Sequence, residues 1–567
     1  MKSSHLLLST VLLALPATMN AQGVIDALRL SQQDLKGTAR YMSMGGAFGA
    51  LGGDLTTLSQ NPAGIGVYRS HEVGITVDLD MQNSSTHTGT WINKENQTKF
   101  LLNNVGGVLT LKLNSDAVPN LNFGFTYNKD VSFNRVYSGY LGDINNSMTS
   151  WIAGVSNANG VTVGDVTFTD NYDPYNPNDG GYPAPWISII GYDKFLINPI
   201  GNPDSPVWEG QWGAPGTNRP GTSGTANYAV SEKGGVDSFN IAFGGNFGNI
   251  VYWGMDFDIS SLNYTRESFY QESLDNAWVD NGQELEQTTS DWNIQNYYNV
   301  SGTGFTYKLG FIVRPIQELR IGFAFHTPTY YSLTQQFGAT VNTNYNGEGW
   351  KGASTNDGIP GYSDFRFITP WKIQVSAAGV IGNKFIISAE YEWAQTSKMH
   401  FNDPIYNNGG YYDWGWDDGW DDDWYYYGRP GTRSGFNSYD KQNQSISRYF
   451  GDTNTIRIGA EYRILPQLSV RAGYSHVSSP VKATTRTANI PTAGTMSDYR
   501  LDKSTNYVTC GLGFRTGGFY ADLAYVYKHI NSTWQPYTND PESGFKAPEA
   551  DVKLNNSQLV LSLGYKF

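Results

Sequence analysis

Apolar and polar residues alternate along most of this chain, and the C-terminus shows the pattern most cleanly. Its last residues place Leu559, Leu561, Leu563, Tyr565 and Phe567 on one face of an extended strand. A period of two is typical of a strand with one apolar face. Beyond the N-terminus no apolar run reaches the roughly 18 residues of a transmembrane helix. We therefore expect an all-β protein.

Fourteen segments share this pattern, and long and short links join them. The segments are 72–82, 97–113, 119–140, 231–248, 250–264, 300–314, 318–337, 370–382, 384–399, 454–464, 467–480, 505–516, 518–530 and 557–567. Short links fall at Asn249, 315–317, Asn383, 465–466 and Gly517, and between them lie linkers of about 14 to 90 residues. Bacterial outer-membrane barrels have an even strand number, short periplasmic turns and long external loops. The rhythm predicts a transmembrane antiparallel β-barrel of about 14 strands, with its C-terminus in the periplasm of a Gram-negative bacterium.

A soluble β-sandwich also alternates apolar and polar residues. It would explain neither the long and short links nor the aromatic residues at the outward ends of segments, where membrane interfaces collect Tyr and Trp. The chain has 16 Trp, 38 Tyr and 27 Phe. Its net charge of -13 and its lack of a basic cluster argue against a nucleic-acid partner. Cys510 is the only cysteine, which excludes an internal disulfide and a cysteine-rich metal site.

Two segments precede the first expected strand. Residues 1–21 have the form of a cleaved secretory signal, with Lys2, an apolar run over 6–15 and Ala21 before the cleavage site. Residues 22–71 are rich in glycine and apolar residues, and they fit a hatch that folds inside the barrel as a plug; a periplasmic tail is the alternative. The small-residue run at 44–53 lacks the Gly-Lys-Ser/Thr ending of a phosphate loop, so its glycines indicate close backbone packing.

Several motifs carry a resemblance to one family. Residues 54–64 read DLTTLSQNPAG, and later come RIGAEY at 457–462, LSVRAGY at 468–474, SPV at 479–481 and DLAYVY at 522–527. In this order they resemble the hatch and C-terminal strands of the outer-membrane long-chain fatty acid transporter family. The likeness covers the hatch and most strands but not the long loops, which we expect at 141–230, 265–299, 338–369 and 400–453 of a barrel spanning 72–567.

The resemblance implies a monomeric barrel that passes hydrophobic compounds, such as long-chain fatty acids, through the outer membrane without an energy source. In the family a ligand is captured in an external groove, moves to an internal apolar pocket and leaves sideways through a gap in the barrel wall into lipid. Asn61, Pro62 and Ala63 match the hatch motif, where a rigid proline and an amide could fix the hatch to the wall; the alternative is a simple turn into the first strand. Phe567 resembles the C-terminal signal that barrel assembly machinery reads.

Strand parity places a set of charged side chains in the lumen: Arg320, His326, Lys372, Glu390, Arg457, Glu461, Arg463 and Arg471. Their simplest role is a solvated or ion-paired lumen that anchors the hatch. A subset could bind a ligand head group, because arginine offers bidentate geometry to a carboxylate. Arg457, Arg471 and His326 are the candidates, and haem, which would use His or Tyr as a ligand, is a weaker possibility.

The long loops suggest a second function. Residues 411–427 interleave aspartates with Trp and Tyr, and a weak Ca²⁺ site is conceivable there. Its ligands would be Asp417, Asp418, Asp421, Asp422 and Asp423. An acidic, solvated loop explains the same pattern. The alternative function is therefore a surface-exposed binding protein, such as a haem receptor or an adhesin. No pattern indicates a catalytic site, so we expect no enzyme activity and no cofactor.

Overall fold

The structure is a computed structural model that describes residues 23–176, 184–213, 221–280, 285–382, 384–404, 439–488, 490, 494–539 and 546–567. The expected signal peptide and the acidic aromatic segment 411–427 lie outside these residues. Among the described residues no helix is both long enough and apolar enough to cross a membrane.

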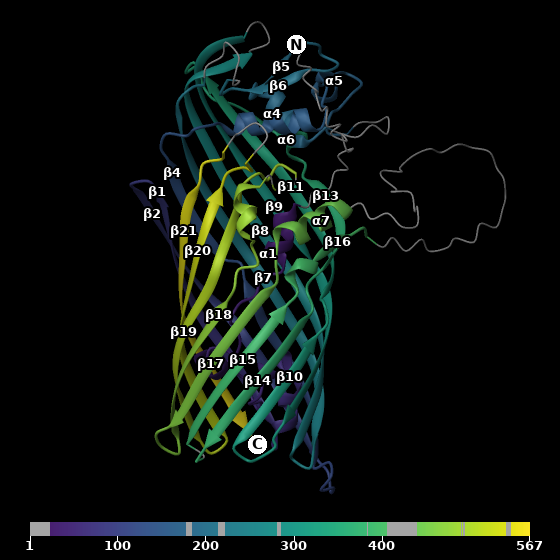
Figure 1. Ribbon diagram of the computed structural model, residues 1–567, viewed down its shortest axis with the longest axis vertical. Helices are drawn as coiled ribbons and strands as arrows, with labels where there is room; N and C mark the ends of the chain where they lie inside the picture. The colour runs from purple at the N-terminus through teal and green to yellow at the C-terminus, as the bar shows by residue number, and fades with distance from the viewer. Residues whose placement is uncertain are drawn as a thin grey trace, which may run out of the picture.

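The chain closes into one antiparallel β-barrel (Figure 1). Ten wall strands are single: β1 (Glu72–Thr88), β2 (Trp91–Lys112), β7 (Gly224–Phe247), β8 (Val251–Asp280), β9 (Leu285–Val313), β17 (Thr453–Arg463), β18 (Leu468–Val477), β19 (Tyr499–Thr516), β20 (Phe519–Gln535) and β21 (Ala550–Lys566). Four more are interrupted: β3–β4 (Asn120–Ser132, Arg135–Leu141), β10–β11 (Leu319–His326, Tyr330–Tyr345), β13–β14 (Gly361–Ile368, Lys372–Ile381) and β15–β16 (Phe385–Ala394, His400–Asn402). β1 pairs with β21 from Glu72↔Lys566 to His87↔Asp551, which closes the ring. The predicted fourteen-stranded barrel is confirmed.

The alternation seen in the sequence separates the two faces of the wall. On β21, Leu559, Leu561 and Leu563 are exposed on the outside, whereas Val560 and Ser562 are buried inside. The short links at Asn249, 315–317, 465–466 and Gly517 form tight turns at the end that holds the C-terminus (Figure 1). Turn residues at this end include left-handed ones, such as Asn249 at φ 56° and Gly517 at φ 58°. Asparagine and glycine adopt this conformation more readily than other residues.

The opposite end is more ordered than the sequence suggests. The expected loop 265–299 is wrong as a loop, because β8 continues to Asp280 and β9 begins at Leu285. Likewise the expected loop 338–369 holds the end of β11, β12 (Lys351–Ser354), η2 (Thr355–Gly358) and β13. Beyond the membrane the outer face of a strand no longer has to be apolar. The alternation of apolar and polar residues is therefore lost there, although the strands remain paired.

A helical cap fills this end (Figure 1). It comprises α4 (Met148–Ala158), α5 (Val163–Val166), α6 (Trp186–Asp193) and the ribbon of β5 (Ile197–Ile200) and β6 (Val207–Gly210). Smaller elements follow: η3 (Thr396–Lys398), α7 (Asp440–Tyr449) and η4 (Ala483–Thr487). Cap side chains such as Trp208 and Ile190 join one apolar core with wall residues such as Trp292. The cap therefore packs as part of the barrel.

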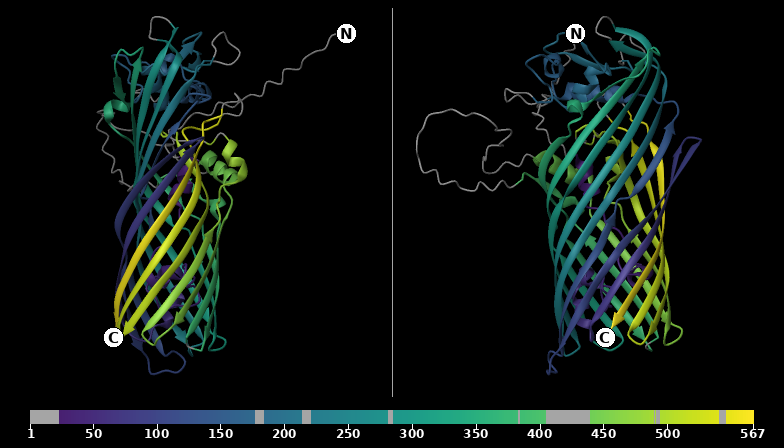
Figure 2. Two further views of the ribbon diagram at one scale, coloured as in Figure 1. Left: turned by 90° about the vertical axis from the view of Figure 1, so that its left-hand side faces the viewer. Right: turned by 180° about the vertical axis from the view of Figure 1, so that it is seen from behind.

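The N-terminal segment, residues 23–71, lies mostly inside the wall (Figure 2). It forms α1 (Val24–Leu30), α2 (Ala39–Ser43), α3 (Thr57–Gln60) and η1 (Pro62–Val67). α2 packs against β18, β19, β20 and β21, whereas η1 packs against β3, β7, β8 and β9. The segment therefore contacts the wall on several sides.

Candidate functional site

The Asn-Pro-Ala motif lies at the junction of α3 and η1, against the wall. The Asn61 side chain accepts a hydrogen bond from Ala63 N at 3.1 Å and donates one to Gly49 O at 2.5 Å. Pro62 occupies the first turn of η1, where its missing N–H has no intrahelical partner to lose. The motif is thus a cap between two short helices, and it does not run directly into β1.

Two wall glycines make room for this motif. A methyl group on Gly310 of β9 would collide with Asn61 Oδ1, and one on Gly254 of β8 would collide with Pro62 O. Glycine lets two backbones approach this closely because it has no Cβ. The lumen face of β8 and β9 is therefore shaped for the Asn-Pro-Ala turn.

Ion pairs hold the N-terminal segment to other strands. Lys36 Nζ lies 2.6 Å from Asp78 Oδ2 and 3.2 Å from Asp80 Oδ2, both on β1. Arg40 Nε lies 3.0 Å from Glu461 Oε2 on β17. These charges are buried, and buried charges persist when they are paired and hydrogen-bonded.

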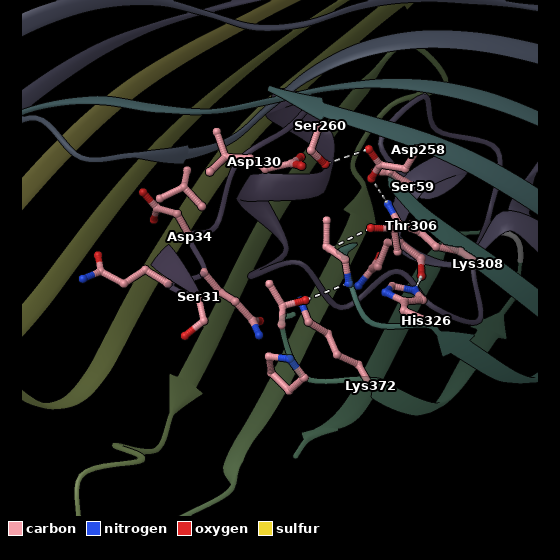
Figure 3. A pocket seen from close by; sticks show the side chains of 18 of the residues that line it. Ser31, Asp34, Ser59, Asp130, Asp258, Ser260, Thr306, Lys308, His326 and Lys372 are labelled. Atoms are coloured by element: carbon pink, nitrogen blue, oxygen red, sulfur yellow. Dashed lines mark hydrogen bonds and ion pairs between the residues drawn. The ribbon is translucent and has the colours of Figure 1, made fainter. Parts of the chain in front are cut away.

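A cavity of about 190 Å³ lies between the N-terminal segment and strands β3, β7, β8, β9, β10, β11, β14, β15 and β17 (Figure 3). Eight of its lining side chains are charged: Asp34, Lys36, Asp130, Asp258, Lys308, Lys372, Glu392 and Arg457. Many of the others carry hydroxyl groups, for example Ser260, Thr306 and Tyr331. Its aliphatic lining is limited to Leu30, Val131, Val236 and Pro370. The cavity is polar, unlike the apolar pocket that the family resemblance implied.

The three predicted head-group residues take different positions. His326 lines the cavity, and its Nε2 lies 2.7 Å from Gln60 O in the N-terminal segment. Arg457 also lines it, but this arginine pairs with Glu390 at 2.5 Å and with Glu392 at 3.2 Å. Both side chains are thus already engaged by the protein.

Arg471 does not line the cavity. Its side chain is 1% exposed, and it pairs with Glu461 at 2.7 Å and Asp522 at 2.6 Å. Because Glu461 also binds Arg40, Arg471 belongs to the network that holds α2. The structure therefore offers no ligand position at Arg471.

The other predicted positions fall elsewhere. Asp417, Asp418, Asp421, Asp422 and Asp423 lie outside the described residues, and within those residues no group of three metal-ligating side chains gathers. Phe567 is exposed, and its backbone exchanges hydrogen bonds with His71 at 3.0 and 3.1 Å. The final strand therefore meets the start of β1.

Sequence reasoning missed Asp130, Asp258 and Lys308 as cavity residues. Lys308 could have been found from parity, since Phe305, Tyr307 and Leu309 on β9 alternate with it. Asp130 could not, because the register between β3 and β7 shifts between Lys129 and Val131. This bulge reverses the parity of every later residue on the strand.

The wall is interrupted beside this bulge. β2 and β3 pair from Lys112↔Asn120 to Asn104↔Asn128, and there the pairing ends. Above that point β2 pairs only with β1, while β4 pairs only with β7. The tip of the β1–β2 hairpin leans out from the wall (Figures 1 and 2). Side chains still join it to β4, where Asn93 Nδ2 donates to Ser138 O at 3.3 Å. We call this interruption the β2–β3 break, and cavity residues Asp130 and Val131 lie directly next to it.

Fold and site together define a class: an outer-membrane-type β-barrel with its N-terminal segment folded inside it. Residues 262–529, just under half of the chain, match the family described as outer membrane protein transport protein (OMPP1/FadL/TodX). The resemblance indicated by the sequence motifs is confirmed by this match over residues 262–529.

Solved structures of the same type align over nearly the whole chain. A Pseudomonas aeruginosa FadL homologue is 11% identical with a TM-score of 0.49, and the alignment covers 94% of this chain and 99% of that chain. The P. putida toluene transporter TodX is 12% identical with a TM-score of 0.45, over 94% and 99% of the two chains. No curated protein matches the chain.

Proposed function

We propose that this protein is a passive, monomeric outer-membrane channel that carries hydrophobic or amphiphilic compounds, such as long-chain fatty acids, from outside into the membrane. The N-terminal segment acts as the hatch that closes the lumen to water. The cargo leaves sideways, and the protein catalyses no reaction. The observation that carries this proposal is the β2–β3 break, which lies beside the lumen cavity.

Sideways exit has a physical reason. A hydrocarbon chain is stabilised by about 0.8 kcal/mol for each CH₂ that leaves water. A cargo that passes directly from the lumen into lipid keeps this stabilisation, because its chain does not cross water on the way. The hatch blocks a straight path because its buried core, which includes Met42, Phe48 and Ala50, packs against lumen-facing Val526 and Val560. A break in the wall is then the route that avoids water.

A groove outside the break supports capture. It lies between the β1–β2 hairpin and strands β4 and β7, has a volume of about 500 Å³, and is lined in part by Trp91, Ile92, Tyr140 and Phe269. The Trp91 and Tyr140 rings meet edge to face, with centroids 5.1 Å apart. Aromatic and apolar linings of this kind are typical of sites for apolar ligands.

The alternative function, a haem receptor or an adhesin, has less support. It depends on the acidic aromatic segment 411–427, which lies outside the described residues. The family match describes transport proteins. We therefore retain the channel as the proposed function.

Deleting Asp130 tests the route. Lys129↔Asp237 and Val131↔Val236 are consecutive pairs with β7, so Asp130 is the extra residue of the bulge. Without it, β3 and β4 should continue in register and close the break. We expect dodecanoate uptake by cells or outer-membrane vesicles to fall at least about fivefold. For scale, a free-energy difference of about 1.4 kcal/mol corresponds to a tenfold change.

The cargo and the control make this result specific. Dodecanoate is an anion, so loss of a carboxylate cannot itself repel it. The control deletes Gly347, an exposed turn residue with open space around its Cα. Unchanged uptake in a folded Asp130 deletion would contradict sideways exit through the β2–β3 break.

A further inference from the structure

The charges of the lumen cavity are balanced, four acidic and four basic among its lining residues. Most are paired within the protein. Lys308 Nζ lies 2.6 Å from Asp258 Oδ2 and 3.5 Å from Asp256 Oδ2. Asp34 Oδ1 lies 3.0 Å from Lys528 Nζ. The pairs of Lys36 and Arg457 are described above. Most lining charges are therefore already neutralised by the protein, and few remain to pair with a charged ligand.

Two lining charges differ from the rest. Neither Asp130 nor Lys372 forms an ion pair with any residue in the described part of the chain. A hydrogen-bond partner of Lys372 is neutral: with the amide of Gln33 oriented so that both of its polar atoms are satisfied, the Gln33 side-chain oxygen accepts from Lys372 Nζ at 3.2 Å. Asp130 stands on β3 and Lys372 on β14, and they enter the cavity from different sides (Figure 3).

Opposite charges separated across a polar chamber match a ligand that carries both signs. We propose that the cavity binds the head group of a zwitterionic amphiphile, with Lys372 facing its phosphate or carboxylate and Asp130 facing its ammonium group. This inference rests on the proposed channel function and names the cargo class. Lys372 would donate a charge-assisted hydrogen bond to the anionic group, and Asp130 would attract the ammonium group by its charge, which acts strongly in a water-poor site.

The position of the apolar lining agrees with this assignment. Val131 and Val236 pair across β3 and β7 directly above the bulge, so they border the break. Both are buried. A head group held between Asp130 and Lys372 would let its hydrocarbon tail pass these two valines toward lipid.

An entirely apolar cargo fits the cavity poorly. It would displace water from hydroxyl and charged groups and return no hydrogen bond to them, and this unfavourable desolvation is not recovered. A fatty acid anion would use Lys372 alone and leave Asp130 without a counter-charge. The zwitterion satisfies both.

Three probes with the same dodecyl tail test the proposal. They are dodecylphosphocholine, which is zwitterionic, dodecanoate, which is anionic, and dodecyltrimethylammonium, which is cationic. Binding to the full chain in dodecyl maltoside is measured by calorimetry below the micellar concentration of each probe. We expect the zwitterion to bind about tenfold more tightly than either ion, a difference of about one charged contact.

Two amide variants test which residue binds each charged group of the ligand. Asp130→Asn should weaken dodecylphosphocholine about tenfold and dodecyltrimethylammonium similarly, while dodecanoate changes little. Lys372→Gln should weaken dodecylphosphocholine and dodecanoate but not the cation. Because neither residue has an ion-pair partner in the described part of the chain, neither change strands a buried charge, and both variants should fold. Lys233→Gln is the control, since Lys233 is half exposed in a pair with Glu267 outside the cavity.

Equal affinity for the three probes would overturn the head-group assignment, and so would the same loss of affinity for every probe in both amide variants. The proposed channel would still stand if dodecanoate uptake depends on the β2–β3 break. Absence of binding by every probe, together with no uptake above that of cells without the protein, would overturn the proposed function as well.

Discussion

At the scale of single residues, the Asn-Pro-Ala motif has meaning only together with two glycines far away in the sequence. Asn61 and Pro62 press against Gly310 and Gly254 on neighbouring strands. The motif itself could be predicted to fix the N-terminal segment to the wall. The two glycines that receive it could not, because inward glycines are frequent on these strands and only the register selects among them.

Gly310→Ala should unseat the N-terminal segment. The added methyl group meets Asn61 and the backbone of Pro62 and Ala63, and overpacking of this kind typically costs about 1–3 kcal/mol. We expect protease to cleave residues 23–71 faster while the barrel keeps its heat-modifiable migration in gels. Gly379→Ala is the matched control, since its nearest neighbour would be Ile387 Cγ2 at an ordinary 3.5 Å. Equal cleavage in both variants would contradict the role given to Gly310.

At the scale of elements, one buried acid joins the cap to the wall. Glu272 accepts a hydrogen bond from Met148 N at 2.8 Å, one from Tyr270 Oη at 2.8 Å and one from the Ser147 hydroxyl. It therefore supplies partners to the open N-terminus of α4. A strand crosses the bilayer in about 9–11 residues, so Glu272, near the far end of β8, lies beyond the membrane.

The stability of the cap should fall as pH rises. Burial raises the pKa of Glu272 from its ordinary 4.5 to about 7. The folded cap then binds this proton more tightly than the unfolded segment does, so the stabilisation is complete below about pH 4.5 and is lost as pH rises toward 7, by about 3 kcal/mol at most. Hydrogen exchange of α4, corrected for intrinsic rates, should show less protection at pH 8 than at pH 5.

Substitution isolates the group responsible. Glu272→Gln should make α4 protection independent of pH, whereas Glu267→Gln, at an exposed position of the same strand, should keep the wild-type pH dependence. The same fall in Glu272→Gln as in the wild type would show that another group titrates.

The ends of the acidic aromatic segment are tied together, which makes it separable from the barrel. Phe401 N donates to Asn443 Oδ1 at 2.8 Å, and Asn443 Nδ2 donates back to Phe401 O at 2.9 Å. The Phe401 and Tyr439 rings lie 5.8 Å apart. Deleting residues 405–438 with a short glycine linker should leave assembly and dodecanoate uptake within about twofold, because the wall contacts stay.

The outcome of this deletion also separates the two functions. Retained uptake is the result expected for a channel. If the deletion abolishes uptake while the barrel still assembles, this segment captures the cargo. If the deletion abolishes only binding to a surface partner, the receptor alternative is favoured.

Elements were predictable where membrane physics constrains them. All fourteen wall strands could be located from alternation, since lipid demands an apolar outer face, and their even count is typical of bacterial outer-membrane barrels. The extensions of β8 and β9 beyond the membrane could not, because Gln271 and Ser273 on the outer face are polar there. The cap helices α4 and α6 also gave no clear signal among many Gly and Pro residues.

At the scale of the whole molecule, the proposed function depends on where the wall is incomplete. Alternation predicts where strands pass but not where pairing stops. Two one-residue bulges lie beside the β2–β3 break, Asn103 on β2 and Asp130 on β3. The bulge at Asp130 also places a carboxylate in the cavity. In the proposed function, the exit route and the recognition of the cargo therefore both depend on local irregularities of the strands beside the break.

Small molecules extracted from protein purified out of native outer membrane test this account most directly. Mass spectrometry should find about one amphiphile per chain with a polar, net-neutral head group, and the absorbance spectrum should show no haem. A stoichiometric haem, or a purely apolar compound held in the lumen, would contradict the account.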